Sequence, residues 1–171
     1  LRTPLAAMRF TDGGARLVVA DVGGEISAWS VAARAWTTLG RLPAGGDDIS
    51  LGSDEQGRIL AAVAAPEGLL LGMEADGFTV IRRLDGVQAN AVTFDGAGRR
   101  VAFARCTEAT KPGRCSRSVI DIHDVATFTG PPTQQIEVGF EPERMVFAAN
   151  GARLACSDGP RIRVWNLEDG S

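Results

Sequence analysis

An internal repeat constrains the fold of this chain more than any other feature of its sequence. Four segments share a Gly-rich turn, then Arg, then an aliphatic residue, and they span residues 10–17, 52–59, 94–101 and 147–154. The spacing from Leu17 to Ile59 and from Ile59 to Val101 is 42 residues, and the next spacing, to Leu154, is 53. A fixed period of this length is typical of chains built from stacked supersecondary units.

A second motif follows each copy of the first. It spans residues 26–31, 70–75, 120–125 and 162–167, and its fourth position holds Trp29, Met73, His123 and Trp165. Two motifs that recur four times in the same order indicate four copies of one structural unit.

Each unit reads as a set of short strands. Runs rich in Val, Ile, Leu and Thr alternate with clusters of Gly, Asp and Pro. In the first unit we expect strands at 5–10, 16–20, 26–31 and 36–39. Convincing helical periodicity is missing, so the sequence predicts an all-β chain with four antiparallel strands per unit.

This pattern resembles the WD40-repeat β-propeller family. The resemblance covers nearly the whole chain and is best in the first and fourth units, where Trp29 and Trp165 fill the Trp position. Asp124 matches the Asp of the Trp-Asp pair, with His123 in place of its Trp, and the Gly-His dipeptide of many such repeats is missing from all four units. The resemblance implies roughly four divergent blades in an incomplete or half ring, and a different propeller of similar blade length is the alternative.

We expect the blades to divide the chain as follows: a strand tail at 1–4, blade 1 at 5–43, blade 2 at 44–85, blade 3 at 86–141 with an insertion at 105–117, and blade 4 at 142–171 without its last strand. Propellers typically have about 4 to 8 blades. The chain is therefore expected to be a piece of a longer propeller or half of a ring.

Charge and composition narrow the function. The chain has 18 basic and 21 acidic residues, a formal net charge of -3, which argues against general nucleic-acid binding. The apolar run at 59–65 is far shorter than the roughly 20 residues of a membrane helix. Without a signal peptide in view, we expect a cytoplasmic protein, and the use of Arg over Lys, with Lys111 the only Lys, is common in bacteria.

The most enzyme-like cluster is Asp121, His123 and Asp124, because a carboxylate can orient an imidazole base. Alternation along a strand places Asp121 and His123 on one face and Asp124 on the other. We therefore expect a structural role for these residues, no enzyme activity, no metal and no cofactor.

Cys106 and Cys115 bracket the insertion in blade 3. Three alternatives stay open: a disulfide across the feet of a hairpin, two free thiols, or two metal ligands. Cys156 lies in an expected strand and reads as a small core residue.

The insertion is also basic, and loops on a rigid scaffold often carry function. The residues that we expect to contact a partner are Arg105, Lys111, Arg114, Arg117 and Trp36. The repeated aromatic residues, by contrast, are expected to pack between blades: Phe10, Trp29, Phe94, Phe147 and Trp165. We expect the repeated arginines to satisfy turn carbonyls or acids between blades rather than to bind a ligand: Arg16, Arg58, Arg100 and Arg153.

The resemblance implies a non-catalytic module for protein-protein interaction or scaffolding. Its partner would be another protein or the rest of its own propeller, or a second copy that closes an eight-bladed ring, rather than nucleic acid or a membrane. The alternative is a sensor or regulatory propeller attached to a kinase, a protease or a nucleotide-switch protein.

Overall fold

The computed structural model of the 171-residue chain describes residues 3–42, 48–64, 68–74, 77–84, 89–111, 114–128 and 130–169. In this part of the chain the only helix is a short 3-10 turn at Asp12–Gly14, and the remaining regular structure is β-strand. None of the residues that the structure describes form a helix long and apolar enough to cross a membrane.

The strands form four separate antiparallel sheets, each a meander of consecutive strands. The first contains β1 (Leu5–Thr11), β2 (Arg16–Asp21), β3 (Glu25–Ser30) and β4 (Ala35–Arg41). The second contains β5 (Asp48–Ser53), β6 (Ile59–Ala64), β7 (Gly68–Glu74) and β8 (Gly77–Leu84). The third contains β9 (Ala89–Phe94), β10 (Arg100–Lys111), β11 (Arg114–Asp124) and β12 (Gln134–Val138). The fourth contains β13 (Arg144–Phe147), β14 (Arg153–Ser157) and β15 (Ile162–Asn166).

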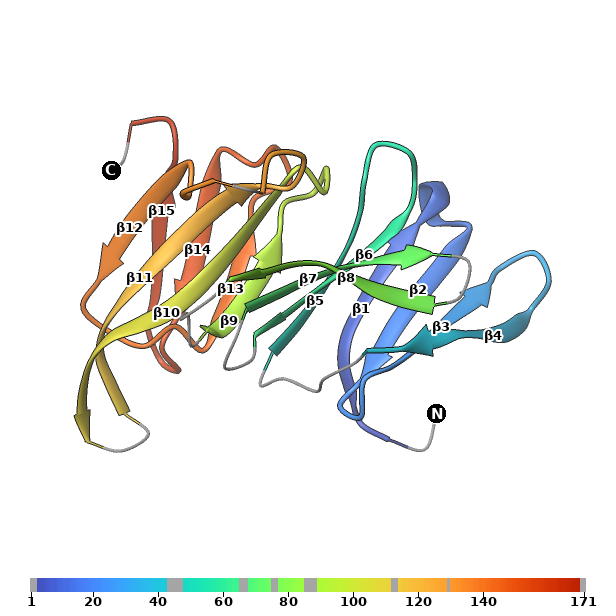
Figure 1. The fold of residues 1–171 in the computed structure, drawn as a ribbon, viewed down its shortest axis with the longest axis horizontal. Coiled ribbons are helices and arrows are strands. Elements are labelled where there is room, and N and C mark those ends of the chain that lie inside the picture. Colours follow the sequence, from blue (N-terminus) through green and yellow to red (C-terminus); the bar gives the residue numbers. More distant parts are fainter. Residues whose placement is uncertain are drawn as a thin grey trace.

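The sheets are the blades of a β-propeller, which confirms the fold class expected from the repeats. Their first strands pack against one another in order, β1 on β5, β5 on β9 and β9 on β13. Blades 1 and 4 lie at opposite ends of this array (Figure 1). We call the side of a blade that is turned toward the earlier blade its front face, and the opposite side its back face.

The hydrophobic core consists of three clusters, one between each pair of neighbouring blades. Successive side chains of a strand point to opposite faces, so a blade with two neighbours must be apolar on both. This explains why every residue of β6 is buried. In β1 and β15, at the two ends of the array, most residues are exposed or partly exposed.

The register corrects the repeat alignment in blade 2. Phe94 pairs with Val101 in blade 3, and Phe147 pairs with Leu154 in blade 4. In blade 2 the residue paired with Ile59 is Ser53, because the turn is one residue shorter. The ungapped alignment places Gly52 in that position, whereas the structure turns Gly52 to the back face of the blade.

The insertion of blade 3 is a second correction. We expected a loop at 105–117, but β10 runs on to Lys111 and β11 begins at Arg114. The two strands stay paired through several register shifts and project from the blade as a long hairpin (Figure 1). The blade boundaries expected after residues 43 and 85, and the chain ends at 1–2 and 170–171, lie outside the described residues.

Candidate functional site

The first strands of all four blades line a cavity of about 300 Å³. At its wall lies Asp48, a buried residue of β5. Its Oδ2 accepts a hydrogen bond from the backbone N–H of Val92 at 3.1 Å, and its Oδ1 lies 2.8 Å from Nη1 of Arg144. Burial raises the pKa of the Asp48 carboxyl, although the charge of Arg144 opposes the shift. Because both oxygens are occupied, this carboxylate ties blades 2, 3 and 4 together rather than serving as a free base.

Two further side chains cross between blades at the same strands. The Oγ of Ser50 accepts a hydrogen bond from the backbone N–H of Phe94 at 3.1 Å. Arg9 donates to the carbonyl oxygens of Leu51, at 3.3 Å, and Gly96, at 2.7 Å. Buried backbone N–H and C=O groups need hydrogen-bond partners, and here side chains of one blade supply these partners to the next blade.

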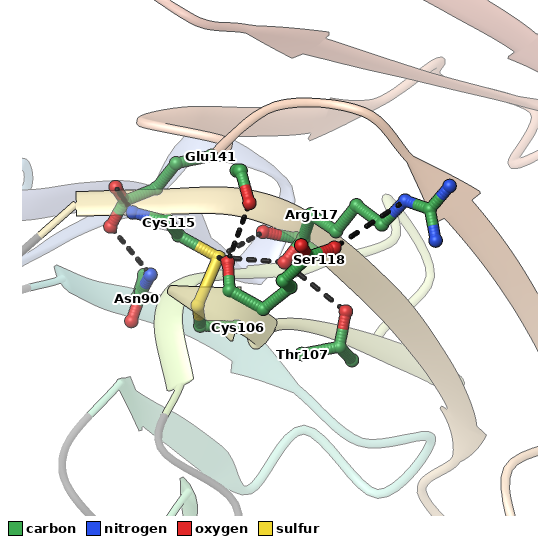
Figure 2. The surroundings of a disulfide bond; sticks show 9 residues. Asn90, Cys106, Thr107, Cys115, Arg117, Ser118 and Glu141 are labelled. Atoms are coloured by element: carbon green, nitrogen blue, oxygen red, sulfur yellow. Dashed lines mark hydrogen bonds and ion pairs between the residues drawn. A yellow bond between two sulfur atoms is a disulfide. The ribbon is translucent and has the colours of Figure 1, made fainter. Parts of the chain in front are cut away.

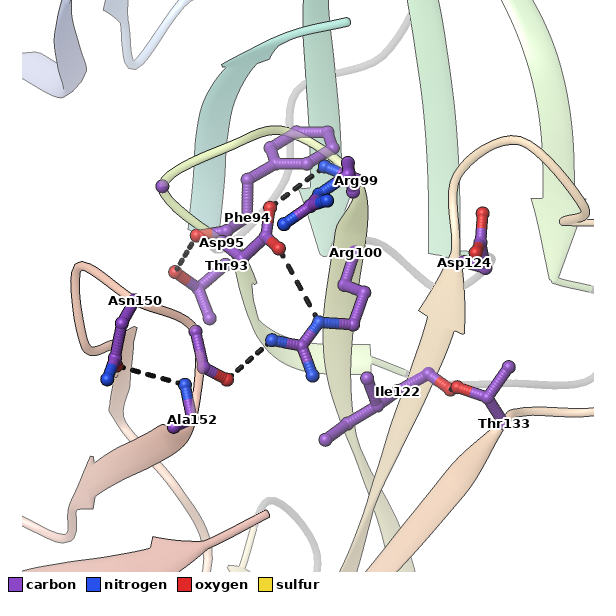
Figure 3. A network of polar contacts seen from close by, with 12 residues as sticks. Thr93, Phe94, Asp95, Arg99, Arg100, Ile122, Asp124, Thr133, Asn150 and Ala152 are labelled. Atoms are coloured by element: carbon purple, nitrogen blue, oxygen red, sulfur yellow. Dashed lines mark hydrogen bonds and ion pairs between the residues drawn. The ribbon is translucent and has the colours of Figure 1, made fainter. Parts of the chain in front are cut away.

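The arginine repeated in each unit holds the turn before it. Arg58 Nε lies 2.9 Å from Asp54, Arg100 Nε lies 3.5 Å from Asp95, and the exposed Arg16 lies 3.6 Å from Asp12. Arg100 also donates to the carbonyl oxygen of Gly151, in blade 4 (Figure 3). The expected role between blades is therefore confirmed for Arg100, whereas Arg16 and Arg58 bind acids of the turn in their own blade.

Asp121 and His123 lie on the front face of blade 3, both buried, as strand alternation predicted. Asp121 is bound by Nε of Arg105 and by Nε2 of Gln135, the latter at 2.6 Å. Burial lowers the pKa of His123, although the Asp121 charge opposes the shift, and the imidazole ring packs 4.8 Å from the ring of Phe128.

Asp124 plays a different part from its two neighbours. It is half-buried, and its carboxylate accepts the backbone N–H of Ala126 at 2.8 Å, which caps the turn after β11. Within the described ranges, no group of three or more His, Cys, Asp or Glu is placed to hold a metal ion. The arrangement around Asp121 is that of a structural ion pair.

Cys106 and Cys115 are joined by a disulfide, with their Cα atoms 5.7 Å apart (Figure 2). They are not direct cross-strand partners, since Cys106 pairs with Ser118 and Cys115 with Ala109. Glu141 accepts the backbone N–H of Cys115 at 3.1 Å, which ties the part of the hairpin next to its turn to the segment after β12. The disulfide and this hydrogen bond therefore hold the end of the hairpin against Cys106 and Glu141.

Three of the five expected partner-binding residues have described side chains, Arg105 and Arg117 on blade 3 and Trp36 on blade 1. Arg105 lies at the cleft around Asp121, and Arg117 is exposed on the hairpin, 3.8 Å from Glu108. The side chains of Lys111 and Arg114 lie outside the described residues. Trp36 is exposed on β4, with its ring 5.5 Å from that of Trp29.

Blade 1 has an exposed front face that carries large apolar side chains. Cross-strand pairing aligns four of them on this face: Phe10, Leu17, Trp29 and Trp36. Phe10 is 64% exposed, so the expectation that it packs between blades is wrong within the described chain, where no blade precedes it. Phe147 and Trp165 do pack against blade 3, as expected, and the buried Cys156 lies in the same core.

The back face of blade 4 is the other exposed blade surface. Pairing aligns Val146, Ala155 and Val164 across it, with Ile162 beside them. Ile162 is 73% exposed. Exposed apolar surface of this extent is the usual mark of a protein-protein contact.

Sequence reasoning missed several residues that the structure brings together. Asp48 and Arg144 form an ion pair although they are 96 residues apart in the sequence. Arg82, from blade 2, lines the same cleft as Asp121 of blade 3. No local motif marks these residues, because each acts across a blade interface. The one usable signal was the pair of adjacent arginines at 82 and 83, which lies in the fourth strand of its blade, whereas the pair at 99 and 100 lies at a turn.

The sequence matches no family model, and no curated protein matches it. The fold, however, matches 1175 chains of solved structures. One of them is the β-propeller domain of Cps50 (Swd1) from Myceliophteria thermophila, a WD40 propeller, with a TM-score of 0.61 and 17% sequence identity. The match covers 95% of this chain and 53% of that one, so the chain spans about half the length of the domain that it resembles.

Proposed function

We propose that this chain, four consecutive blades with the fold of a WD40-like β-propeller, is a non-catalytic protein-interaction module. The observation that carries the proposal is the pair of exposed apolar faces, the front of blade 1 and the back of blade 4. Such faces are favourable only when another protein surface covers them.

The internal interfaces indicate what kind of surface would fit. At the junction of blades 2 and 3, the ring of Phe94 packs directly on Gly52, so closely that a Cβ at Gly52 would lie 2.9 Å from the ring. At the junction of blades 3 and 4, Phe147 belongs to the same core as Ala102 and Ala104. Blades 3 and 4 thus each place a large aromatic side chain in a core with small residues of the earlier blade, whereas blade 2 has Ser53 in this position.

The two exposed faces have the same complementary character. The front of blade 1 offers Phe10, in the position of Phe94 and Phe147. The back of blade 4 offers Ala155, flanked by Val146 and Val164. We take the occupant of each face to be a second copy of the chain, so that two sets of four blades close one ring of eight. In that ring Trp36 would become an interface residue, as the sequence suggested.

The solution mass tests this proposal. Light scattering on the eluting peak of a sizing column should give twice the 18.0 kDa chain mass. Phe10→Ser and Val164→Glu each alter one exposed face, so each should return the species to the single-chain mass without loss of β-structure in circular dichroism.

Val22→Ser is the matched control, because Val22 is an exposed apolar residue in the turn after β2 and lies on neither face. It should leave the mass unchanged. A chain that keeps the single-chain mass at every concentration would overturn the assignment of the second copy, and a double mass that survives both face variants would place the contact elsewhere.

A further inference from the structure

A polar cleft of about 450 Å³ opens between blades 2 and 3, away from the two exposed faces. Its volume falls within the range of roughly 300–1,000 Å³ that is usual for ligand pockets. One wall is the end of β8, with Arg82 and Arg83, and the other is the front face of blade 3 with Arg105. The cleft thus brings the guanidinium groups of Arg82 and Arg105, from two blades, near one carboxylate, that of Asp121.

Arg105 is held in place by only one of its nitrogens. Its Nε binds Asp121, which is buried and whose other oxygen accepts from Gln135 at 2.6 Å. Among the described residues, no hydrogen bond or ion pair engages the two terminal nitrogens of Arg105. These two donors lie at the planar end of a fixed side chain, which is the geometry that suits a carboxylate.

Arg82 is the second available cation. It is half-buried at the cleft, and it makes no ion pair or hydrogen bond within the described part of the chain. A charge that is partly removed from water without a partner is unfavourable, so an anion from outside would relieve it. Asp121 cannot serve this purpose, because Arg105 and Gln135 already occupy its oxygens.

The remaining lining of the cleft favours a peptide over a polyphosphate. Leu84, Phe128 and Pro132 supply apolar contacts beside the arginines. We propose that this cleft binds an acidic peptide segment of a partner protein, with one of its carboxylates between Arg82 and Arg105 and a neighbouring apolar side chain on Phe128 and Pro132.

The test is a binding titration by fluorescence anisotropy. The probe is a short fluorescein-labelled peptide of alternating glutamate and leucine, and the matched probe has glutamine in place of glutamate. The glutamate peptide should bind and the glutamine peptide should bind at least about tenfold more weakly, because charge-assisted hydrogen bonds are lost.

Two variants test the arginines of the cleft, and a third variant, outside the cleft, is the control. Arg82→Gln should weaken binding about tenfold. Arg105→Lys keeps a positive charge for Asp121 but loses the planar fork, so it should also weaken binding while the thermal transition is retained. Arg34→Gln removes the same charge from the exposed turn of blade 1 and should bind like the unaltered chain.

Two outcomes of the titration would contradict the proposal. Equal affinity of Arg82→Gln and Arg34→Gln, or of the two peptides, would overturn the cleft assignment. Displacement of the peptide by inorganic phosphate at equal concentration would overturn the choice of a peptide ligand. The titration is independent of the solution mass, so failure here is distinct from failure of the ring closure.

Discussion

Phe94 and Phe10 occupy the same position in two blades, yet their surroundings are opposite. Each lies at the end of the first strand of its blade, just before the turn, and pairs with an aliphatic residue, Val101 or Leu17. Phe94 is 5% exposed because its ring lies on Gly52 of the preceding blade, whereas Phe10 is 64% exposed. The comparison shows that a blade supplies half of an interface, and that its neighbour decides whether that half is buried.

Truncation of the two phenylalanines should give the largest difference in the free energy of unfolding. Phe94→Ala removes a ring from a packed interface and should lower the free energy of unfolding by about 3–5 kcal/mol. Phe10→Ala should cost less than about 1 kcal/mol in the dilute single chain, because the ring is already in water. Urea unfolding followed by circular dichroism measures both values.

The same pair also reports on assembly. If a second copy covers the front of blade 1, the cost of Phe10→Ala should grow with protein concentration, because association stabilises only the intact face. Similar losses for Phe94→Ala and Phe10→Ala in the dilute chain would contradict the difference in burial.

The repeated arginine offers a second test of the same contrast. Arg100 pairs with the buried Asp95 and bonds Gly151 across the blade interface, so Arg100→Gln should cost about 1.5–3 kcal/mol. Arg16 pairs only with the exposed Asp12, and Arg16→Gln should change stability by no more than about 0.5 kcal/mol. The midpoints of urea unfolding for the two variants give the comparison, and equal midpoints would mean that the contact across the interface contributes nothing.

Gly52 tests the tightness of the interface without removing any contact. In Gly52→Ala the new Cβ would lie 2.9 Å from the ring of Phe94, and the ring must move, at a cost of about 1–3 kcal/mol. Gly139 is the matched control, since a Cβ there meets nothing within 4 Å. We expect Gly139→Ala to be close to neutral in the same thermal unfolding experiment, and a neutral Gly52→Ala would show that the blades can separate slightly without loss.

The smallest expected effect is a pH dependence at Asp48. Burial raises the pKa of this carboxyl above 3.8, so the native state holds the proton more tightly than the unfolded chain does. The contribution of Asp48 to stability therefore falls as pH rises from 3.8 through the native pKa, and it is recovered as pH is lowered.

Asp48→Asn removes this dependence. The stability of the unaltered chain relative to the variant should therefore increase between pH 7 and pH 4. Ser50→Ala lies on the same strand and does not titrate, so the difference that it causes should stay constant over that range. An Asp48→Asn difference that is constant, or that moves the other way, would contradict the shift.

Much of each blade could be predicted from its own residues. The alternation of side chains placed Asp121 and His123 on one face, and the repeat spacing placed Arg58 and Arg100 directly after a turn. These features depend on residues a few positions apart. The insertion is harder to predict, because its register shifts leave no clear alternation between 105 and 117, although the segment forms paired strands.

The sequence by itself determined that the chain is all-β, that it repeats four times, and where the turns lie, since spacing, alternation and turn chemistry act within one hairpin. Only the tertiary structure decided that Asp48 meets Val92 and Arg144, and that Arg82 and Arg105 share a cleft. The physical reason is that these contacts depend on how one twisted sheet stacks on the next. No single repeat encodes that stacking, just as nothing in the hairpin around Phe10 tells whether a neighbour will cover it.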